Sequence, residues 1–182
     1  MTNRNARRCT ASLLAAACLW AGASPARART VILVRHAEKA AEPAGDPALT
    51  LEGRARAGML AAALRDARPT RVLTSPFRRT RDTAAPTAAA AGVRPQAVPV
   101  GRDPATHVAA TVALIREIPE DAVVLVVGHG DTVPLIAAAL GAPAPVAIPP
   151  CAFDRMVIMT LGRSPPATVA ARYGPPSADC PD

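Results

Sequence analysis

Two short apolar runs in this sequence each lead into a histidine, and they limit the folds that the chain can adopt. Residues 31–34 are Val-Ile-Leu-Val and are followed directly by Arg35 and His36. Residues 122–127 are Ala-Val-Val-Leu-Val-Val and lead through a glycine to His129. Unbroken apolar runs of this length are typical of strands buried on both faces, as in a parallel sheet covered by helices. Because polar side chains are costly to bury, we expect the chain to leave the sheet at these histidines.

Helical patterns alternate with the predicted strands along the chain. This order predicts an α/β fold with three layers, α/β/α, around a mostly parallel central sheet, and the last two strands are expected to form a hairpin. Thr50 and Ser75 are the expected N-caps of the first two helices. The predicted helices span residues 50–67, 77–91, 104–118 and 133–141, and the predicted strands span residues 31–34, 71–75, 96–98, 122–127, 153–161 and 168–173.

The first 28 residues have the pattern of an export signal. The segment begins with basic residues, residues 10–23 form an apolar stretch too short to span a bilayer, and Ala26-Arg27-Ala28 fits a cleavage site between small residues. We therefore expect a signal peptide over residues 1–28 and a single domain over residues 29–182, in a periplasmic or secreted protein. A lipoprotein tethered through Cys18 is the alternative.

The charge of the chain does not indicate a nucleic-acid partner. The formal net charge is +7, but four of the 21 basic side chains lie in residues 1–28, which contain no acid. The rest of the chain has 17 basic and 14 acidic side chains, scattered rather than clustered, and aromatic residues make up only 2% of the sequence. We therefore expect neither nucleic-acid binding nor a stable membrane span.

Two cysteines, Cys151 and Cys180, lie outside the predicted signal peptide. In an oxidising compartment an even number of cysteines favours a disulfide, which would clamp the C-terminal tail to the loop at residues 149–151. Two unpaired thiols are the alternative, because the sequence does not give the distance between the two residues.

The two histidine motifs resemble those of the histidine phosphatase superfamily, also called phosphoglycerate-mutase-like. The pair Arg35-His36 resembles the family's Arg-His-Gly, although this chain has Ala37 in the third place. The glycine and His129 resemble the family's second motif, with Asp131 where asparagine is common.

Two further stretches resemble the same family and lie in the expected order. Residues 46–53 resemble a structural stretch written D-x-x-L-T-x-x-G, and residues 75–84 resemble S-P-x-x-R-A-x-x-T-A, in which Arg79 takes the place of the conserved arginine. The resemblance covers residues 30–174 and implies the family's fold.

The resemblance also implies a set of roles for individual residues. It implies that His36 forms a covalent phosphohistidine, that Arg35 and Arg79 bind phosphoryl oxygens, and that His129 hydrogen-bonds another phosphoryl oxygen. The residue types suit this chemistry, because guanidinium groups bind phosphate bidentately and a neutral imidazole is a good nucleophile toward phosphorus. The second ring nitrogen of His36 is expected to be held by a backbone carbonyl.

An alkoxide leaving group needs a proton donor, and the sequence offers three carboxyl groups for this role. Asp103 lies in the loop from which the family often supplies its acid, Asp131 follows the second histidine by two residues, and Glu38 follows the first. We expect Asp103 to be the acid and keep Asp131 as the first alternative. Both aspartates could instead cap the helices that follow them.

The sequence predicts no metal and no cofactor. His36, His129 and Asp131 are metal-ligand types, but no paired-histidine or paired-cysteine spacing is present, and the two arginines would repel a cation. The remaining histidine, His107, has no motif around it and is predicted to lie on a helix surface.

The resemblance thus implies a phosphomonoester hydrolase that acts on a phosphorylated small molecule or phosphopeptide. Two alternatives remain open at this point: a non-catalytic phospho-ligand-binding protein on the same fold, and a phosphomutase, which the short chain disfavours. The sequence does not identify the substrate.

Overall fold

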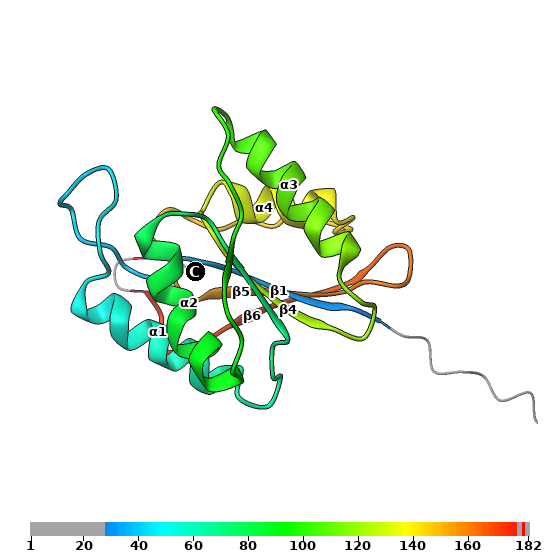
Figure 1. Ribbon diagram of the computed structural model, residues 1–182, viewed down its shortest axis with the longest axis horizontal. Helices are drawn as coiled ribbons and strands as arrows, with labels where there is room; N and C mark the ends of the chain where they lie inside the picture. The colour runs from blue at the N-terminus through cyan, green and yellow to red at the C-terminus, as the bar shows by residue number, and fades with distance from the viewer. Residues whose placement is uncertain (1–27, 178–179, 181–182) are drawn as a thin grey trace, which may run out of the picture.

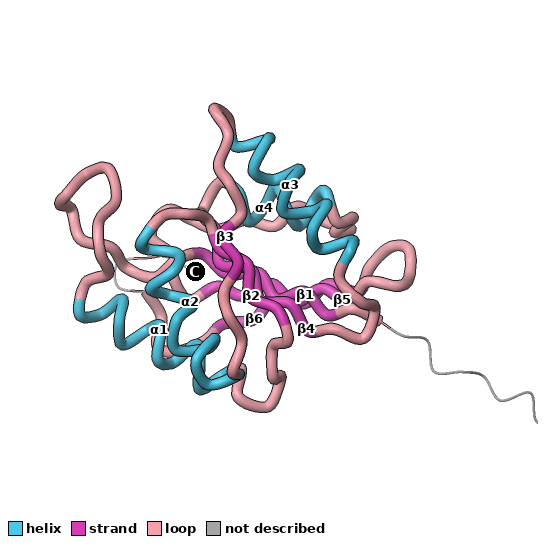
Figure 2. The backbone as a smooth tube through the Cα atoms, in the orientation of Figure 1, coloured by secondary structure: helices cyan, strands magenta, loops and turns pink. Residues whose placement is uncertain are grey.

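The computed structural model describes residues 28–177 and residue 180, and contains a mixed sheet with helices on both faces (Figures 1 and 2). Residues 1–27, which hold most of the predicted signal peptide and Cys18, lie outside the described residues. The strands are β1 (Thr30–Arg35), β2 (Arg71–Thr74), β3 (Gln96–Ala97), β4 (Val123–Gly128), β5 (Arg155–Thr160) and β6 (Ala167–Arg172), and the helices are α1 (Leu51–Ala63), α2 (Arg78–Ala91), α3 (Pro104–Glu117) and α4 (Thr132–Ala139).

The sheet has the strand order β3-β2-β4-β1-β5-β6. The first four strands are parallel, and β5 and β6 form the antiparallel terminal hairpin. The predicted three-layer α/β fold is therefore confirmed. Parallel pairing brings the carboxyl ends of β1, β2 and β4 to one edge of the sheet, which is where ligands bind in open α/β sheets.

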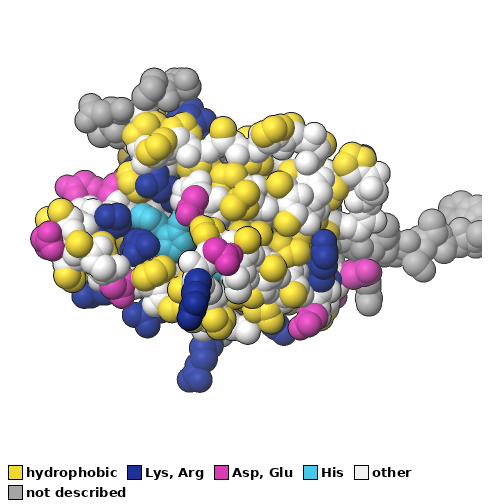
Figure 3. Space-filling model, turned by 90° about the horizontal axis from the view of Figure 1, so that it is seen from above, with side chains coloured by type: hydrophobic (Ala, Val, Ile, Leu, Met, Phe, Trp, Pro, Cys, Tyr) yellow, Lys and Arg dark blue, Asp and Glu magenta, His cyan; other side chains and the backbone are white. Residues whose placement is uncertain are grey.

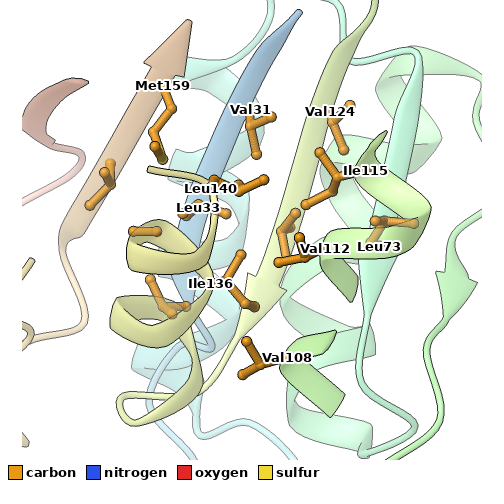
Figure 4. Close-up of a cluster of buried hydrophobic side chains, with 14 of the residues drawn as sticks. Val31, Leu33, Leu73, Val108, Val112, Ile115, Val124, Ile136, Leu140 and Met159 are labelled. Carbon is orange, nitrogen blue, oxygen red and sulfur yellow. The ribbon is translucent and has the colours of Figure 1, made fainter. Parts of the chain in front are cut away.

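Side chains that alternate along the central strands form two separate cores. In β1, Val31 and Leu33 pack toward α3 and α4, in the cluster drawn in Figure 4. Ile32 and Val34 point the other way and join a second cluster with Leu60 of α1 and with residues of α2. Figure 1 shows the two helix pairs on opposite sides of the sheet. A strand buried on both faces needs the continuous apolar run that the sequence has there.

The helix starts agree with the sequence only in part. Thr50 caps α1 as predicted, accepting a hydrogen bond from the backbone N–H of Gly53 at 3.1 Å. Ser75 does not cap α2: the helix begins three residues later, after Phe77, which makes no side-chain cap. The first helical N–H, of Arg78, instead donates to the carboxylate of Asp46 at 2.6 Å. The expected N-cap was wrong because the Ser75 hydroxyl is used inside the protein.

The C-terminal tail is tied to the loop that precedes β5. Cys151 and Cys180 form a disulfide, the first of the two possibilities that the sequence left open. In the same region the Ser177 hydroxyl accepts a hydrogen bond from the backbone N–H of Phe153 at 2.7 Å. In the described part of the chain, no helix has the length and hydrophobicity needed to cross a membrane.

Candidate active site

The strand register places the two predicted histidines side by side. Arg35, the last residue of β1, pairs with Gly128, the last residue of β4, and the N–H of His36 donates to the carbonyl of Gly128 at 2.9 Å. His36 and His129 therefore both follow the carboxyl ends of neighbouring parallel strands. Their ring centroids lie 5.4 Å apart, with the rings inclined at 68°.

The ring of His36 is buried and fixed in one orientation. Its Nδ1 lies 2.8 Å from the carbonyl oxygen of Ala37, and because a carbonyl can only accept, Nδ1 carries the proton when the ring is neutral. This leaves the Nε2 lone pair free. Burial, with smaller contributions from the positive charges of Arg35 and Arg79, lowers the pKa of His36 to about 3. The ring is therefore neutral at pH 7.

The turn that carries His36 is supported by α1 and α2. The backbone N–H of Ala37 donates to the hydroxyl of Thr83 at 2.9 Å, and that hydroxyl donates to the carbonyl of Arg79 at 2.7 Å. Ala37 itself is fully buried against Leu49 and Ala57. A methyl group thus fills a small gap beside α1 at the position where the family often has glycine.

His129 is held by a residue that the sequence did not assign to the site. Its Nε2 lies 2.9 Å from the hydroxyl oxygen of Ser75, which is fully buried at the end of β2 and also bonds to the Thr80 hydroxyl at 2.8 Å. Nδ1 is therefore the nitrogen that remains for a ligand. Burial lowers the pKa of His129 to about 4, with a further contribution from the positive charge of Arg79.

The side chain of Arg35 is held in place by the loop at residues 149–152. Its Nη1 donates to three backbone carbonyls, those of Pro149 at 3.2 Å, Pro150, and Ala152 at 3.3 Å. Its guanidinium carbon also lies 4.2 Å from the ring centroid of Phe153. The Nε of Arg35 is buried and has no partner among the described residues.

Arg79 lies in the first turn of α2 and is the half-buried member of a group of three arginines. Its guanidinium stacks on Phe77 at 4.3 Å, Asp46 lies at the limit of ion-pair distance, 4.0 Å, and its Nε is buried without a partner in the part of the chain that the structure describes. Arg78 and Arg81 are exposed, and Arg78 pairs with Asp82 along the helix. Only Arg79 of the three lines the cavity.

The three candidate carboxyl groups lie in different surroundings. Asp103 and Asp131 both line the cavity and both cap helices, Asp103 through the N–H of Thr106 at 2.8 Å and Asp131 through the N–H of Thr132 at 2.9 Å. Glu38 instead pairs with the buried Arg56 at 2.7 Å and does not line the cavity.

The two aspartates differ in the charged groups that lie near them. Burial lowers the pKa of Arg35, and the negative charge of Asp131 acts against this shift. Asp131 also opposes the burial shifts of Arg79 and His129. Asp131 therefore stands beside the positive groups, whereas Asp103 lines the cavity as part of the segment 100–104.

His107 is buried, so its predicted place on the helix surface is wrong. Only 3% of its surface is exposed, and its Nδ1 lies 3.1 Å from the carbonyl oxygen of Pro99. The sequence signal for this burial is its spacing of four and eight residues from Thr111 and Ile115, which are also buried. The side chain of His107 lines the same cavity as the other two histidines.

These residues surround a cavity of about 660 Å³ at the carboxyl ends of the strands. In the view of Figure 3, histidine surface is visible on this face of the molecule, flanked by basic and acidic side chains. The cavity is lined by Arg35, His36, Lys39, Phe77, Arg79, Val100, Gly101, Arg102, Asp103, Pro104, His107, His129, Gly130, Asp131, Thr132, Ile148 and Pro150.

The arrangement suits a tetrahedral dianion. Two guanidinium groups, whose Nε atoms have no partner among the described residues, provide charged donors. A neutral imidazole with a free Nε2 lies 5.4 Å, between ring centroids, from the second imidazole. Within residues 28–177 and 180 there is no group of three or more His, Cys, Asp or Glu side chains placed to hold a metal ion.

Comparison with known proteins agrees with this geometry. Residues 31–103 match the sequence model of the histidine phosphatase superfamily (branch 1). This segment contains Arg35, His36, Arg79 and Asp103. No curated protein sequence matches the chain.

Several solved structures share the fold over most of their length. SixA from Nakamurella multipartitia is 26% identical, with a TM-score of 0.57 over 85% of this chain and 100% of that one. The protein histidine phosphatase SixA in complex with tungstate is 24% identical, with a TM-score of 0.59 over 79% and 95%. A mycobacterial glucosyl-3-phosphoglycerate phosphatase is 16% identical, with a TM-score of 0.60 over 81% and 99%. The sequence match over residues 31–103, the shared fold and the paired histidines lead to one conclusion: the chain resembles the histidine phosphatase superfamily in its fold and in the residues of its site.

Proposed function

We propose that the protein is a phosphomonoester hydrolase that works through a covalent phosphohistidine at His36. The observation that carries this proposal is the 2.8 Å contact between Nδ1 of His36 and the carbonyl oxygen of Ala37, because it fixes the tautomer whose Nε2 is free to attack phosphorus. The low pKa of about 3 keeps this nitrogen unprotonated at pH 7.

In the first step of the proposed reaction, Nε2 attacks phosphorus, the P–O ester bond breaks, and the leaving oxygen takes a proton from a carboxylic acid. In the second step, water attacks phosphorus, the P–N bond breaks, and the same carboxylate takes the proton of the water. Arg35 and Arg79 bind the non-bridging oxygens, and His129 donates to another oxygen from Nδ1 while the Ser75 hydroxyl donates to Nε2.

We assign the acid to Asp103. Its position supports this choice, because Asp103 lines the cavity from the segment 100–104, apart from the turn that places Asp131 beside Arg35 and Arg79. Asp131 stands beside those arginines, where its negative charge opposes their pKa shifts. A carboxylate in that position stabilises the two guanidinium groups rather than protonating the leaving oxygen.

The solved structures that share this fold suggest two classes of substrate. One solved neighbour is a protein histidine phosphatase and another is a glucosyl-3-phosphoglycerate phosphatase. Both phosphorylated proteins and phosphorylated small molecules are therefore candidate substrates for this chain. A panel containing a phosphohistidine peptide, a sugar phosphate and p-nitrophenyl phosphate distinguishes the two classes.

The mechanism is tested by trapping the intermediate. Acid-sensitive, base-stable radioactivity should remain on the protein after quenching with ³²P-labelled substrate, and peptide mapping should assign it to His36 among the three histidines of the chain. His36→Ala should lose both the label and turnover. Substantial turnover by this variant would exclude the mechanism, and binding of phosphate esters without turnover by the wild-type protein would favour the non-catalytic alternative.

We also propose that the protein is exported, with a mature chain that begins at Arg29. The export pattern of residues 1–28 supports this, and so does the Cys151–Cys180 disulfide, because such bonds persist mainly in oxidising compartments. The intact mass of the periplasmic or secreted protein tests the proposal. A lipid-modified mass starting at Cys18 would instead support the tethered alternative.

A further inference from the structure

The anchor of Arg35 is a short loop that leads to β5. All three carbonyls that accept from Arg35 Nη1 belong to residues 149–152 of this loop. The next residue, Phe153, stacks its ring on the same guanidinium at 4.2 Å, and this ring also lies 6.2 Å from that of His36. The loop uses Nη1 and one face of the guanidinium, and it leaves the buried Nε unpartnered among the described residues.

The disulfide is placed in the middle of this anchor. Cys151 lies between Pro150 and Ala152, two of the three residues whose carbonyls hold Arg35, and it is bonded to Cys180 of the tail. The sequence separation of the two cysteines is 29 residues, so the bond joins segments that the sheet hairpin separates.

The tail itself is attached to the body of the protein. The N–H of Tyr173 donates to the carbonyl of Asp154 at 3.0 Å, and the Ser177 hydroxyl donates to the Asp154 carboxylate at 3.2 Å. The buried Arg56 of α1 donates to the carbonyl of Pro175 at 3.0 Å. Residues 173–177 are therefore held against the body of the protein, close in sequence to the cysteine that the disulfide joins to the loop.

We propose that the Cys151–Cys180 disulfide is a positioning element for Arg35 and thereby sets the affinity of the site for oxyanions. An arginine side chain loses rotamer entropy when a ligand fixes it, and a guanidinium held beforehand in the bound position avoids much of this loss. Carbonyls on an untethered loop would hold Nη1 only part of the time. This inference rests on the proposed role of Arg35 as a phosphate ligand.

The test is a double-mutant cycle read out by binding. The variants are C151S/C180S, Arg35→Ala and the combination of the three substitutions, and tungstate binding is measured by calorimetry well below the lowest Tm of the set. We expect the Kd of tungstate to rise about 10-fold on removing the disulfide from the wild-type protein. In the Arg35→Ala background the same removal should change the Kd less than 2-fold.

Two results would overturn the inference. One is an unchanged Kd in C151S/C180S. The other is an equal loss of affinity with and without Arg35, because a general effect on folding or on the cavity does not depend on that side chain. Loss of the disulfide should also lower Tm by a similar amount with and without Arg35. The inference is therefore judged by the Kd of tungstate and not by Tm.

A second measurement applies if C151S/C180S does not fold. The folded wild-type and Arg35→Ala proteins can be reduced with dithiothreitol, which becomes its cyclic disulfide while the cystine takes up two electrons and two protons to give two thiols. The Kd of tungstate for the oxidised and reduced forms of both proteins then gives the same double-mutant cycle. Because binding needs no turnover, a protein that binds tungstate in this disulfide-dependent way but hydrolyses no ester would overturn the proposed hydrolase and leave this inference standing.

Discussion

The Nε2 atom of His129 lies 2.9 Å from the hydroxyl oxygen of Ser75, a residue 54 positions earlier in the chain. Ser75 is fully buried, so its hydroxyl has no water to replace this contact. We predict that Ser75→Ala frees the His129 ring to rotate and lowers kcat/KM about 10-fold, equivalent to about 1.4 kcal/mol. Steady-state kinetics with p-nitrophenyl phosphate measures the change.

The control for Ser75 is Thr87→Ala, which removes another buried hydroxyl from the α2 region. The Thr87 hydroxyl has no partner among the described residues and lies away from the cavity. The Thr87→Ala variant should have a kcat/KM within 2-fold of the wild-type value. Equal losses in the two variants would show that burial of a hydroxyl, rather than the bond to His129, is what matters.

Much of this site follows from patterns that are local in the sequence. The buried strands could be predicted because each is a continuous apolar run, and the two histidines follow because parallel strands end at the same edge. Thr50 and Asp103 could be recognised as N-caps because a cap bonds to an N–H only three residues away. Local patterns thus placed His36, His129 and the helix that follows Asp103.

The contacts that orient these groups are long-range and have no local pattern. The bond from Ser75 to His129 and the bonds from Arg35 to residues 149–152 depend on how separate loops fold over the strand ends. Ser75 resembled an N-cap because it stands before Pro76, a residue favoured at the first position of a helix, but its hydroxyl bonds to His129 and to Thr80 instead. His107 was misplaced because a single polar residue on an apolar stripe carries little information by itself.

The packing of α1 on the His36 turn predicts opposite effects for two glycines of one helix. A Cβ at Gly53 would lie 2.1 Å from the carbonyl oxygen of Glu38, whereas a Cβ at Gly58 would meet nothing within 4 Å. We predict that Gly53→Ala lowers the free energy of unfolding by roughly 2 kcal/mol and reduces turnover, because the Glu38 backbone must move. Gly58→Ala should raise it by about 0.5–1 kcal/mol. Urea unfolding of both variants tests this, and equal effects would contradict the packing.

The low histidine pKa values predict that stability falls on acidification. His36 and His129 have pKa values of about 3 and about 4 in the folded protein, and about 6.5 when unfolded. Between pH 6.5 and 4 the unfolded state therefore binds more protons, so the free energy of unfolding decreases as pH falls, by up to about 1.4 kcal/mol per pH unit for each histidine.

His36→Asn is the variant that tests this pH dependence. It removes one of the two titrating imidazoles, so its free energy of unfolding should fall less steeply than that of the wild type between pH 6.5 and 4. Urea unfolding at several pH values measures both slopes. Parallel curves would mean that His36 has an ordinary pKa in the folded protein.

The proposed mechanism uses only groups of the protein, so chelators should not inhibit it. Vanadate, which adopts the five-coordinate geometry of the transition state, should bind more tightly than inorganic phosphate and compete with substrate. Inhibition constants for both anions, with and without EDTA, test this. A loss of turnover in EDTA that a divalent ion restores would require a metal in the reaction.

Substrates with different leaving groups can show whether Asp103 or Asp131 is the general acid. A general acid is needed when the leaving oxygen is strongly basic, so its loss should slow an alkyl phosphate far more than an aryl phosphate. We predict that Asp103→Asn slows hydrolysis of an alkyl phosphate by roughly 10²-fold or more and that of p-nitrophenyl phosphate much less. Asp131→Asn should slow the hydrolysis of both substrates by the same factor, since it removes a negative charge beside Arg35 and Arg79 and no proton donor.

Stability should interfere little with this comparison. Each aspartate caps a helix through Oδ1, at 2.8 Å from the N–H of Thr106 for Asp103 and at 2.9 Å from the N–H of Thr132 for Asp131. The amide oxygen of asparagine can accept the same hydrogen bond, so both caps are kept. Any difference between the variants then reflects the carboxyl proton rather than the fold. If the alkyl-selective loss appears in Asp131→Asn instead, the acid belongs to the turn after β4, and the assignment of Asp103 is wrong.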